Sequence, residues 1–126
     1  MSVLKIDGQS FGVSVISLQR KASILDGDNA NRAKSGRMIR DIIGTYYNYT
    51  VGIDPNLLSR SEYDALYEIL TSPVESHELT VPYGQGEITF SAYISNVDDT
   101  LKRMTSSNLW TDLKVNFIAM APARTP

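Results

Sequence analysis

The feature that most constrains the fold of this chain is a period of two among its apolar residues. Within residues 47–53, every second side chain is aromatic or β-branched: Tyr47, Tyr49, Val51 and Ile53. Residues 109–119 separate in the same way into two faces, one of them mostly apolar. Successive side chains of a β-strand point to opposite faces, so each stretch is predicted to be a strand with one packed face.

Two hairpins are predicted from turn residues that lie between strand-like stretches. The first lies within residues 2–18 and turns at Asp7-Gly8. The second joins His77–Tyr83 to residues 87–95 through Gly84-Gln85-Gly86. Glycine and aspartate are typical of such turns because they tolerate the left-handed backbone conformation that a tight turn requires.

One helix is predicted after residue 58. Ser59 and Glu62 have the spacing of a capping box, in which each side chain accepts a hydrogen bond from the backbone N–H of the other residue. Four residues then recur at helical spacing: Tyr63, Leu66, Tyr67 and Leu70. Pro73 ends the run, because proline has no N–H to donate. We therefore expect a helix over residues 61–70 with one buried stripe.

The order of the elements predicts a small β-sandwich or barrel with one flanking α-helix. The second strand of the first hairpin is expected to continue through residues 17–25. A long polar loop at about residues 26–40 follows, which lacks apolar periodicity and is expected to be exposed. A short helical turn is expected at residues 98–104. The 126 residues suit one domain, 1–126, in which the short proline-rich tail at 122–126 adds no folding element.

The residue types argue against catalysis, a cofactor or a metal site. The chain has no cysteine and one histidine, His77, which excludes thiolate metal sites, cysteine nucleophiles and the usual zinc ligand sets. Ser76 does not pair with His77 as a nucleophile, because neighbours on an extended chain point to opposite faces. We interpret His77 as a solvated residue at a strand edge. Gly84-Gln85-Gly86 lacks the third glycine of a dinucleotide site.

A calcium loop and a membrane helix are not supported either. Asp26 and Asp28 match the start of a calcium loop, but Ala30, Asn31 and Arg37 occupy the places of a ligand, the glycine and the bidentate glutamate. No apolar run approaches the ~20 residues that span a bilayer, and the first residues lack the apolar core of a signal peptide. We expect no interaction with a membrane.

The formal net charge of −2 hides two oppositely charged regions. Residues 20–40 carry six bases against two acids, a balance of +4, and residues 54–99 carry nine acids against one arginine, a balance of −8. The bases of the polar loop are Arg32, Lys34, Arg37 and Arg40. The acids of the expected helix are Glu62, Asp64 and Glu68. Opposite charges on one chain favour contacts between copies, so these seven residues are the candidate subunit interface.

Nucleic-acid binding by the polar loop is the alternative use of its bases. Lysine and arginine side chains neutralise phosphates, and this is the main source of non-specific affinity. The loop, however, lacks the interleaved aromatic residues on which bases stack, and the rest of the chain is acidic and repels a polyanion. Contacts between protein copies are the better fit to this charge pattern.

Five segments follow one another in an order that resembles a known group of proteins. These segments are residues 35–41 (SGRMIRD), 44–53, 61–70, 79–86 (LTVPYGQG) and 113–122. The chain resembles the small structural proteins of long-tailed bacteriophages and of prophages of Gram-positive bacteria. Its element order is similar to the tail-tube fold of tube, distal-tail and baseplate-hub proteins. In that fold, a β-sandwich with a flanking helix extends a long loop onto the neighbouring subunit.

The resemblance implies a virion protein of the phage tail that is made in the cytoplasm of the host bacterium. It implies a homo-oligomeric, hexameric ring that stacks on other phage tail proteins around a channel, through which DNA passes without specific binding. A head–tail joining or tail-terminator protein is the alternative within this class. From a different class, a monomeric carbohydrate-binding β-sandwich would use stacking side chains: Tyr46, Tyr47, Tyr49, Tyr93 and Trp110.

Overall fold

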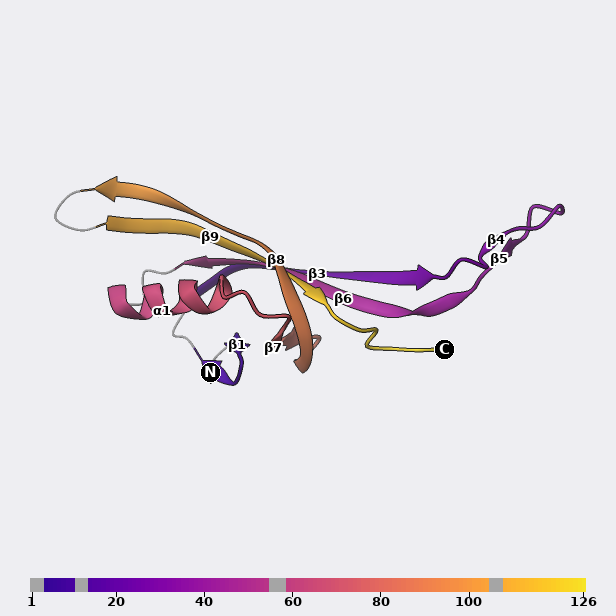
Figure 1. Ribbon diagram of the computed structural model, residues 1–126, viewed down its shortest axis with the longest axis horizontal. Coiled ribbons are helices and arrows are strands. Elements are labelled where there is room, and N and C mark those ends of the chain that lie inside the picture. Colours follow the sequence, from indigo (N-terminus) through magenta and orange to yellow (C-terminus); the bar gives the residue numbers. More distant parts are fainter. Residues whose placement is uncertain (1–3, 11–13, 55–58, 105–107) are drawn as a thin grey trace.

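The computed structural model describes residues 4–10, 14–54, 59–104 and 108–126, and it shows an elongated molecule (Figure 1). Within these residues one helix, α1 (Arg60–Leu70), accompanies nine strands. The strands are β1 (Lys5–Ile6), β2 (Gln9–Ser10), β3 (Ser14–Asp26), β4 (Asn31–Arg32), β5 (Met38–Ile39), β6 (Ile42–Asp54), β7 (His77–Tyr83), β8 (Gly86–Met104) and β9 (Asn108–Ala119). The prediction of a mainly β protein with one helix is confirmed.

Seven of the strands form one antiparallel sheet in the order β2-β1-β7-β8-β9-β6-β3, and β4 pairs with β5 in a separate two-stranded sheet. β2 and β3 are the edges of the larger sheet, which therefore stays open in the described part of the chain. The predicted barrel would require a closed sheet, and the sheet of the described residues is open. This open, bent sheet is consistent with the predicted sandwich-like fold.

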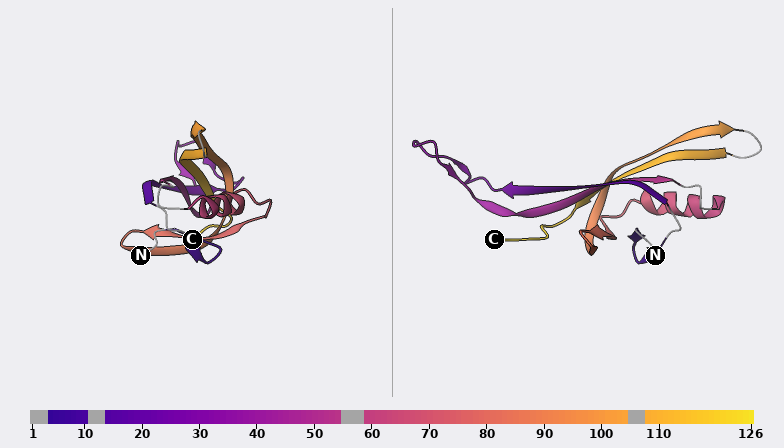
Figure 2. Two further views of the ribbon diagram at one scale, coloured as in Figure 1. Left: turned by 90° about the vertical axis from the view of Figure 1, so that its left-hand side faces the viewer. Right: turned by 180° about the vertical axis from the view of Figure 1, so that it is seen from behind.

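β8 connects the two halves of this folded sheet. Its first part, up to Ala92, pairs with β7, whereas the part from Ala92 to Met104 pairs with β9 (Figure 2). A register shift between Ile94 and Asn96 marks the bend. Such a bulge bends a strand and increases its local twist. As a result, the Tyr49 hydroxyl of β6 donates a hydrogen bond of 3.1 Å to the Pro82 carbonyl of β7, although two strands separate β6 from β7 in the sheet.

The core lies between the two halves of the sheet and α1. Buried side chains come from β1, β6, β7, β8, β9 and the helix, with Leu66 fully buried at the centre of α1. The predicted capping box is confirmed: Glu62 N–H donates to the Ser59 hydroxyl, and Ser59 N–H donates to the Glu62 carboxylate. Tyr63 and Leu70 of the predicted stripe are also buried, and Tyr67 is partly buried against the core.

Two predictions about local structure were wrong. Residues 98–104 are not helical but belong to β8, whose register shifts between Asp98 and Thr100 and again between Leu101 and Arg103. These bulges interrupt the period of two that would have indicated a strand. The first hairpin does turn at Asp7-Gly8, but it is short and joins β1 to β2. The longer strand that follows, β3, pairs with β6 instead.

The C-terminal tail packs along β6, where no folding element was expected. Thr45 forms an isolated β-bridge with Arg124, and its N–H donates to the Arg124 carbonyl at 2.8 Å. The tail approaches so closely that a Cβ atom on Gly44 would lie 2.5 Å from Pro122 Cβ and 2.6 Å from the Arg124 oxygen. Glycine is therefore required at position 44, because any side chain would displace the tail.

Candidate assembly surface

A two-stranded ribbon projects from the body of the protein and ends in a small hairpin. β3 and β6 pair along their whole length, from Ser14 with Asp54 to Asp26 with Ile42, but only residues 49–53 of β6 also pair with β9. The ribbon therefore continues beyond the sheet, and Figure 1 shows β4 and β5 at its far end. We call residues 24–43 the arm. It contains the polar loop predicted from the sequence.

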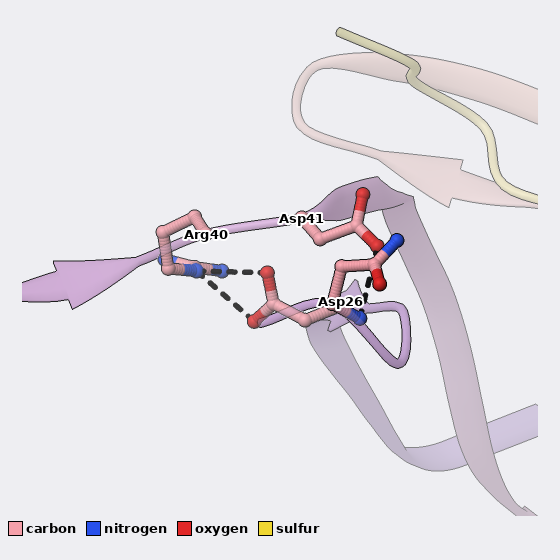
Figure 3. A network of polar contacts seen from close by, with 4 residues as sticks. Asp26, Arg40 and Asp41 are labelled. Atoms are coloured by element: carbon pink, nitrogen blue, oxygen red, sulfur yellow. Dashed lines mark hydrogen bonds and ion pairs between the residues drawn. The ribbon is translucent and has the colours of Figure 1, made fainter. Parts of the chain in front are cut away.

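The base of the terminal hairpin is closed by an ion pair within the chain. Arg40 Nε lies 2.9 and 3.0 Å from the two carboxylate oxygens of Asp26 (Figure 3). Beside it, Gly27 N–H donates to the Asp41 carbonyl at 2.7 Å. The hydrogen bond from Arg40 lowers the pKa of the Asp26 carboxyl, and the same contact raises the pKa of Arg40. Of the four predicted basic interface residues, Arg40 thus has a partner in its own chain.

The other three bases lie at the exposed end of the hairpin: Arg32 ends β4, and Lys34 and Arg37 lie between β4 and β5. The Arg32 guanidinium donates to the Gly36 carbonyl at 3.0 Å, and Ala33 N–H donates to the Arg37 carbonyl at 2.8 Å. These bonds order the turn within one chain. Lys34 and Arg37 form no ion pair with any residue that the structure describes, and both side chains are exposed. They remain available to a partner.

The arm also carries exposed apolar side chains, which the sequence analysis missed. Six large hydrophobic residues are between 39% and 58% exposed: Ile24, Leu25, Met38, Ile39, Ile42 and Ile43. Residues 24 and 25 are consecutive, as are 42 and 43, so both faces of the ribbon are apolar. The available signal was three consecutive apolar pairs, Ile24-Leu25, Met38-Ile39 and Ile42-Ile43, within or beside the polar loop. A strand exposed on both faces has no alternating pattern to reveal it.

The three predicted acidic interface residues lie on α1, away from the arm. Glu62, Asp64 and Glu68 are all exposed, and Glu62 also caps its own helix. The views in Figures 1 and 2 place α1 and the tip of the arm at opposite ends of the molecule. The predicted bases and acids are therefore not brought together within one chain. A contact between them requires two copies.

Asp64 and Glu68 border a cavity of about 280 Å³ between α1 and the β8–β9 hairpin, which Tyr63, Asp99 and Trp110 also line. The Tyr63 hydroxyl donates a hydrogen bond of 2.5 Å to the Asp99 carboxylate. Burial and this hydrogen bond raise the pKa of Tyr63, so the hydroxyl keeps its proton. This contact fixes the helix to β8 and leaves Asp64 and Glu68 at the rim.

A groove lies at the other end of α1. It has a volume of about 620 Å³ and is lined by the end of the helix, the loop that follows, the bend of β8 and the start of the C-terminal tail. Three of its residues are large, apolar and exposed: Val74 at 54%, Tyr93 at 40% and Met120 at 40%. Glu75, which is also exposed, adds a negative charge to the lining.

The prediction that His77 is solvated was wrong. Its side chain is 4% exposed, and Nδ1 lies 2.7 Å from an Asp7 carboxylate oxygen. The other Asp7 oxygen accepts a hydrogen bond of 2.9 Å from Glu78 N–H. Burial raises the pKa of Asp7, but the hydrogen bonds from His77 and Glu78 and the interaction with the His77 charge outweigh it and lower the pKa overall. His77 thus attaches the β1–β2 hairpin to β7.

Four of the five aromatic residues considered for carbohydrate stacking do not share a surface. Tyr47 and Tyr49 are buried in the core, at 9% and 1% exposure. Tyr93 and Trp110 lie eight positions apart along the β8–β9 pair, since Trp110 is opposite Leu101. This spacing corresponds to about 26 Å along the strand. One sugar ring cannot contact both.

The described residues form neither a metal site nor a membrane-spanning helix. No three histidine, aspartate or glutamate side chains of this part of the chain gather as metal ligands would. The helix in the described segments falls short of the length and hydropathy needed to cross a membrane. The exposed features that remain are the arm, the groove and the acidic face of α1.

Comparisons with known proteins assign no family to the chain. A scan against protein-family models found no match. A search of curated proteins likewise found no similar sequence. The features of the molecule that bear on function are therefore the arm and the surfaces that could receive it.

Proposed function

We propose that this protein is a structural subunit of a bacteriophage tail or baseplate, and that it assembles head to tail into a ring around the DNA channel. The observation that carries this proposal is the arm, which projects from the body with exposed apolar residues on both faces. Its basic tip lies far from the acidic face of α1. The resemblance of the element order to tail-tube proteins supplies the biological setting.

The arm supports association because its apolar side chains are unfavourable in water. The six residues are about half exposed on average, so burying them all is equivalent to burying about three whole side chains. At about 1.5–3 kcal/mol for each whole side chain, complete burial contributes about 4–9 kcal/mol. Six exposed large apolar side chains in one projecting segment are unusual for a monomer, and exposed apolar patches commonly mark interaction sites.

Unlike surfaces at opposite ends permit a head-to-tail contact between copies. A two-fold contact in which each arm binds the other copy would also pair these surfaces, but it ends at a dimer, whereas the resemblance to tail-tube proteins implies a ring. A head-to-tail contact joins the arm to a different, acidic region and closes into a ring when the rotation between neighbours permits. The exposed charges would contribute little to affinity, about 0–1 kcal/mol for each pair, but they would favour the correct register.

A ring of this type would act as a mechanical part of the virion. Copies in a ring, six by the resemblance, would stack on other phage tail proteins and enclose a channel for DNA. DNA needs no sequence-specific contact to pass through, and the net charge of −2 disfavours tight binding to a polyanion.

The test removes the arm without disturbing the strands below it. Asp26 pairs directly with Ile42, so replacing residues 27–41 by Asn-Gly gives a two-residue turn that suits an antiparallel hairpin. The four exposed apolar arm residues that remain, Ile24, Leu25, Ile42 and Ile43, are changed to threonine in the same variant. We expect the intact protein to form rings under the electron microscope and oligomers in light scattering. The shortened protein should be a folded monomer by circular dichroism and light scattering. Rings of normal size from the shortened protein, or a monomeric intact protein at all concentrations, would contradict the proposal.

A further inference from the structure

The exposed hydrophobic residues of the described chain fall into two groups. The described residues include nine exposed large apolar side chains. Six lie on the arm, and three lie in the groove beside α1. The groove residues are Val74, Tyr93 and Met120. Two separate apolar surfaces on one chain are the arrangement that a head-to-tail contact requires, since each covers the other on a neighbouring copy.

The groove has a shape that can receive side chains. Its volume of about 620 Å³ lies within the range of pockets that enclose ligands. Leu70 and Val97 contribute apolar side chains to its lining, so the groove is continuous with the core. The cavity beside Asp64 and Glu68, in contrast, has a volume of about 280 Å³ and none of the exposed large hydrophobic residues.

The charges of the groove complement those of the arm. Glu75 is exposed in the lining, and Glu68 lies in the last turn of the nearby helix. α1 has no basic residue in its last turn, so the negative end of the helix dipole is uncompensated there. On the arm, Lys34 and Arg37 are exposed and form no ion pair among the described residues. A basic tip therefore suits this end of the helix.

We infer that the groove of one copy receives the arm of the next copy. The inference rests on the proposed head-to-tail assembly and identifies its receiving surface as Val74, Glu75, Tyr93 and Met120, in place of the acidic face of α1. The chain's own arm does not fill the groove, because Figure 1 shows the arm extending away from α1 and from the loop that follows it. Apolar contact between Ile39 and Val74 would accompany pairing of the basic tip with Glu75.

Disulfide crosslinking tests this contact directly, because the chain has no cysteine of its own. One chain carries a single cysteine on the arm, as Ile24→Cys, Ile39→Cys or Ile43→Cys, and a second chain carries Val74→Cys. A disulfide requires the two Cα atoms to lie about 4.4–6.8 Å apart. After mixing and mild oxidation, at least one arm position should give a crosslinked dimer that contains both chains. Glu62→Cys, on the acidic face of α1, replaces Val74→Cys in the control mixture.

The outcomes separate this inference from the proposed function. Crosslinks to position 62 instead of 74, crosslinks between two arm cysteines, or no crosslink while light scattering shows oligomers would each overturn the groove as the receiving surface but leave assembly standing. A monomeric protein would refute the assembly itself, and the inference with it. As a second measurement, Val74→Lys should weaken assembly at least tenfold and leave the circular dichroism spectrum unchanged. Asp64→Lys, on the acidic face of α1, should weaken it less than threefold.

Discussion

Replacing three arm residues by threonine should separate assembly from folding. Ile24, Ile39 and Ile43 are 58%, 50% and 44% exposed, so they contribute little to the packing of a single copy. Threonine keeps the branched Cβ that strands favour, and surface substitutions of this kind usually change stability by less than about 0.5 kcal/mol each. The triple variant should therefore fold normally as a monomer.

The expected loss of affinity follows from the same exposed fractions. The three side chains expose the equivalent of about one and a half whole side chains. Their burial contributes about 2–4 kcal/mol to each contact. Losing this contribution would raise the dissociation constant about 30-fold to 1000-fold. The methyl group of threonine retains part of this contact, so the measured loss should lie toward the lower value.

Light scattering over a dilution series measures this change, and urea unfolding measures the stability of the monomer. The control variant carries Gln19→Thr and Lys21→Thr, two exposed positions on β3 below the arm, and should assemble like the original protein. Equal dissociation constants for the triple variant and the control would refute the argument that the apolar side chains of the arm hold the assembly together.

Three further predictions concern the fold that supports the arm. Leu66→Ala should lower the free energy of unfolding by about 2–5 kcal/mol in urea, because Leu66 is fully buried, and Glu68→Ala should serve as a nearly neutral control. Gly44→Ala should displace the C-terminal tail, which limited trypsin digestion would report as faster cleavage after Arg124, while an unchanged rate would contradict the close contact. The pKa of Asp7 is lowered in the folded state, so its contribution to stability is present above its usual value of 3.8 and is lost as the pH falls through the folded pKa. In urea unfolding, the difference between the original protein and Asp7→Asn should therefore be constant near neutral pH and shrink below about pH 4, and a difference that grows on acidification would contradict this sign.

The elements that the sequence predicted well are those set by neighbouring residues. The capping box of Ser59 and Glu62 and the stripe of the helix lie within a few residues of one another. The turn at Gly84-Gln85-Gly86 and the period of two in β9 are also local. These features predicted the helix, a hairpin and a strand, and the structure has all three.

The features that the sequence did not predict depend on contacts between distant residues. Nothing near His77 indicates that Asp7, 70 positions away, accepts its hydrogen bond. The pairing of β3 with β6, instead of with β1, is decided by packing and not by turn residues. The apolar residues of the arm were overlooked because a ribbon exposed on both faces has no periodic pattern. The predicted charges were placed on the surface as expected, but Arg40 is paired with Asp26.

One strand belongs both to the core and to the arm. Residues 49–53 of β6 are fixed by β9 on one side and β3 on the other, and the same strand continues outward to Ile42. In the proposed assembly, the direction of the arm is therefore set by the twist of a single ribbon. Neighbours in a ring of six are related by a rotation of about 60° and in a ring of five by about 72°. The difference of about 12° amounts to about 1° for each of the 13 residues of β6, a small fraction of ordinary strand twist. The curvature of the ring, and with it the width of its channel, would thus be determined inside the core of each subunit.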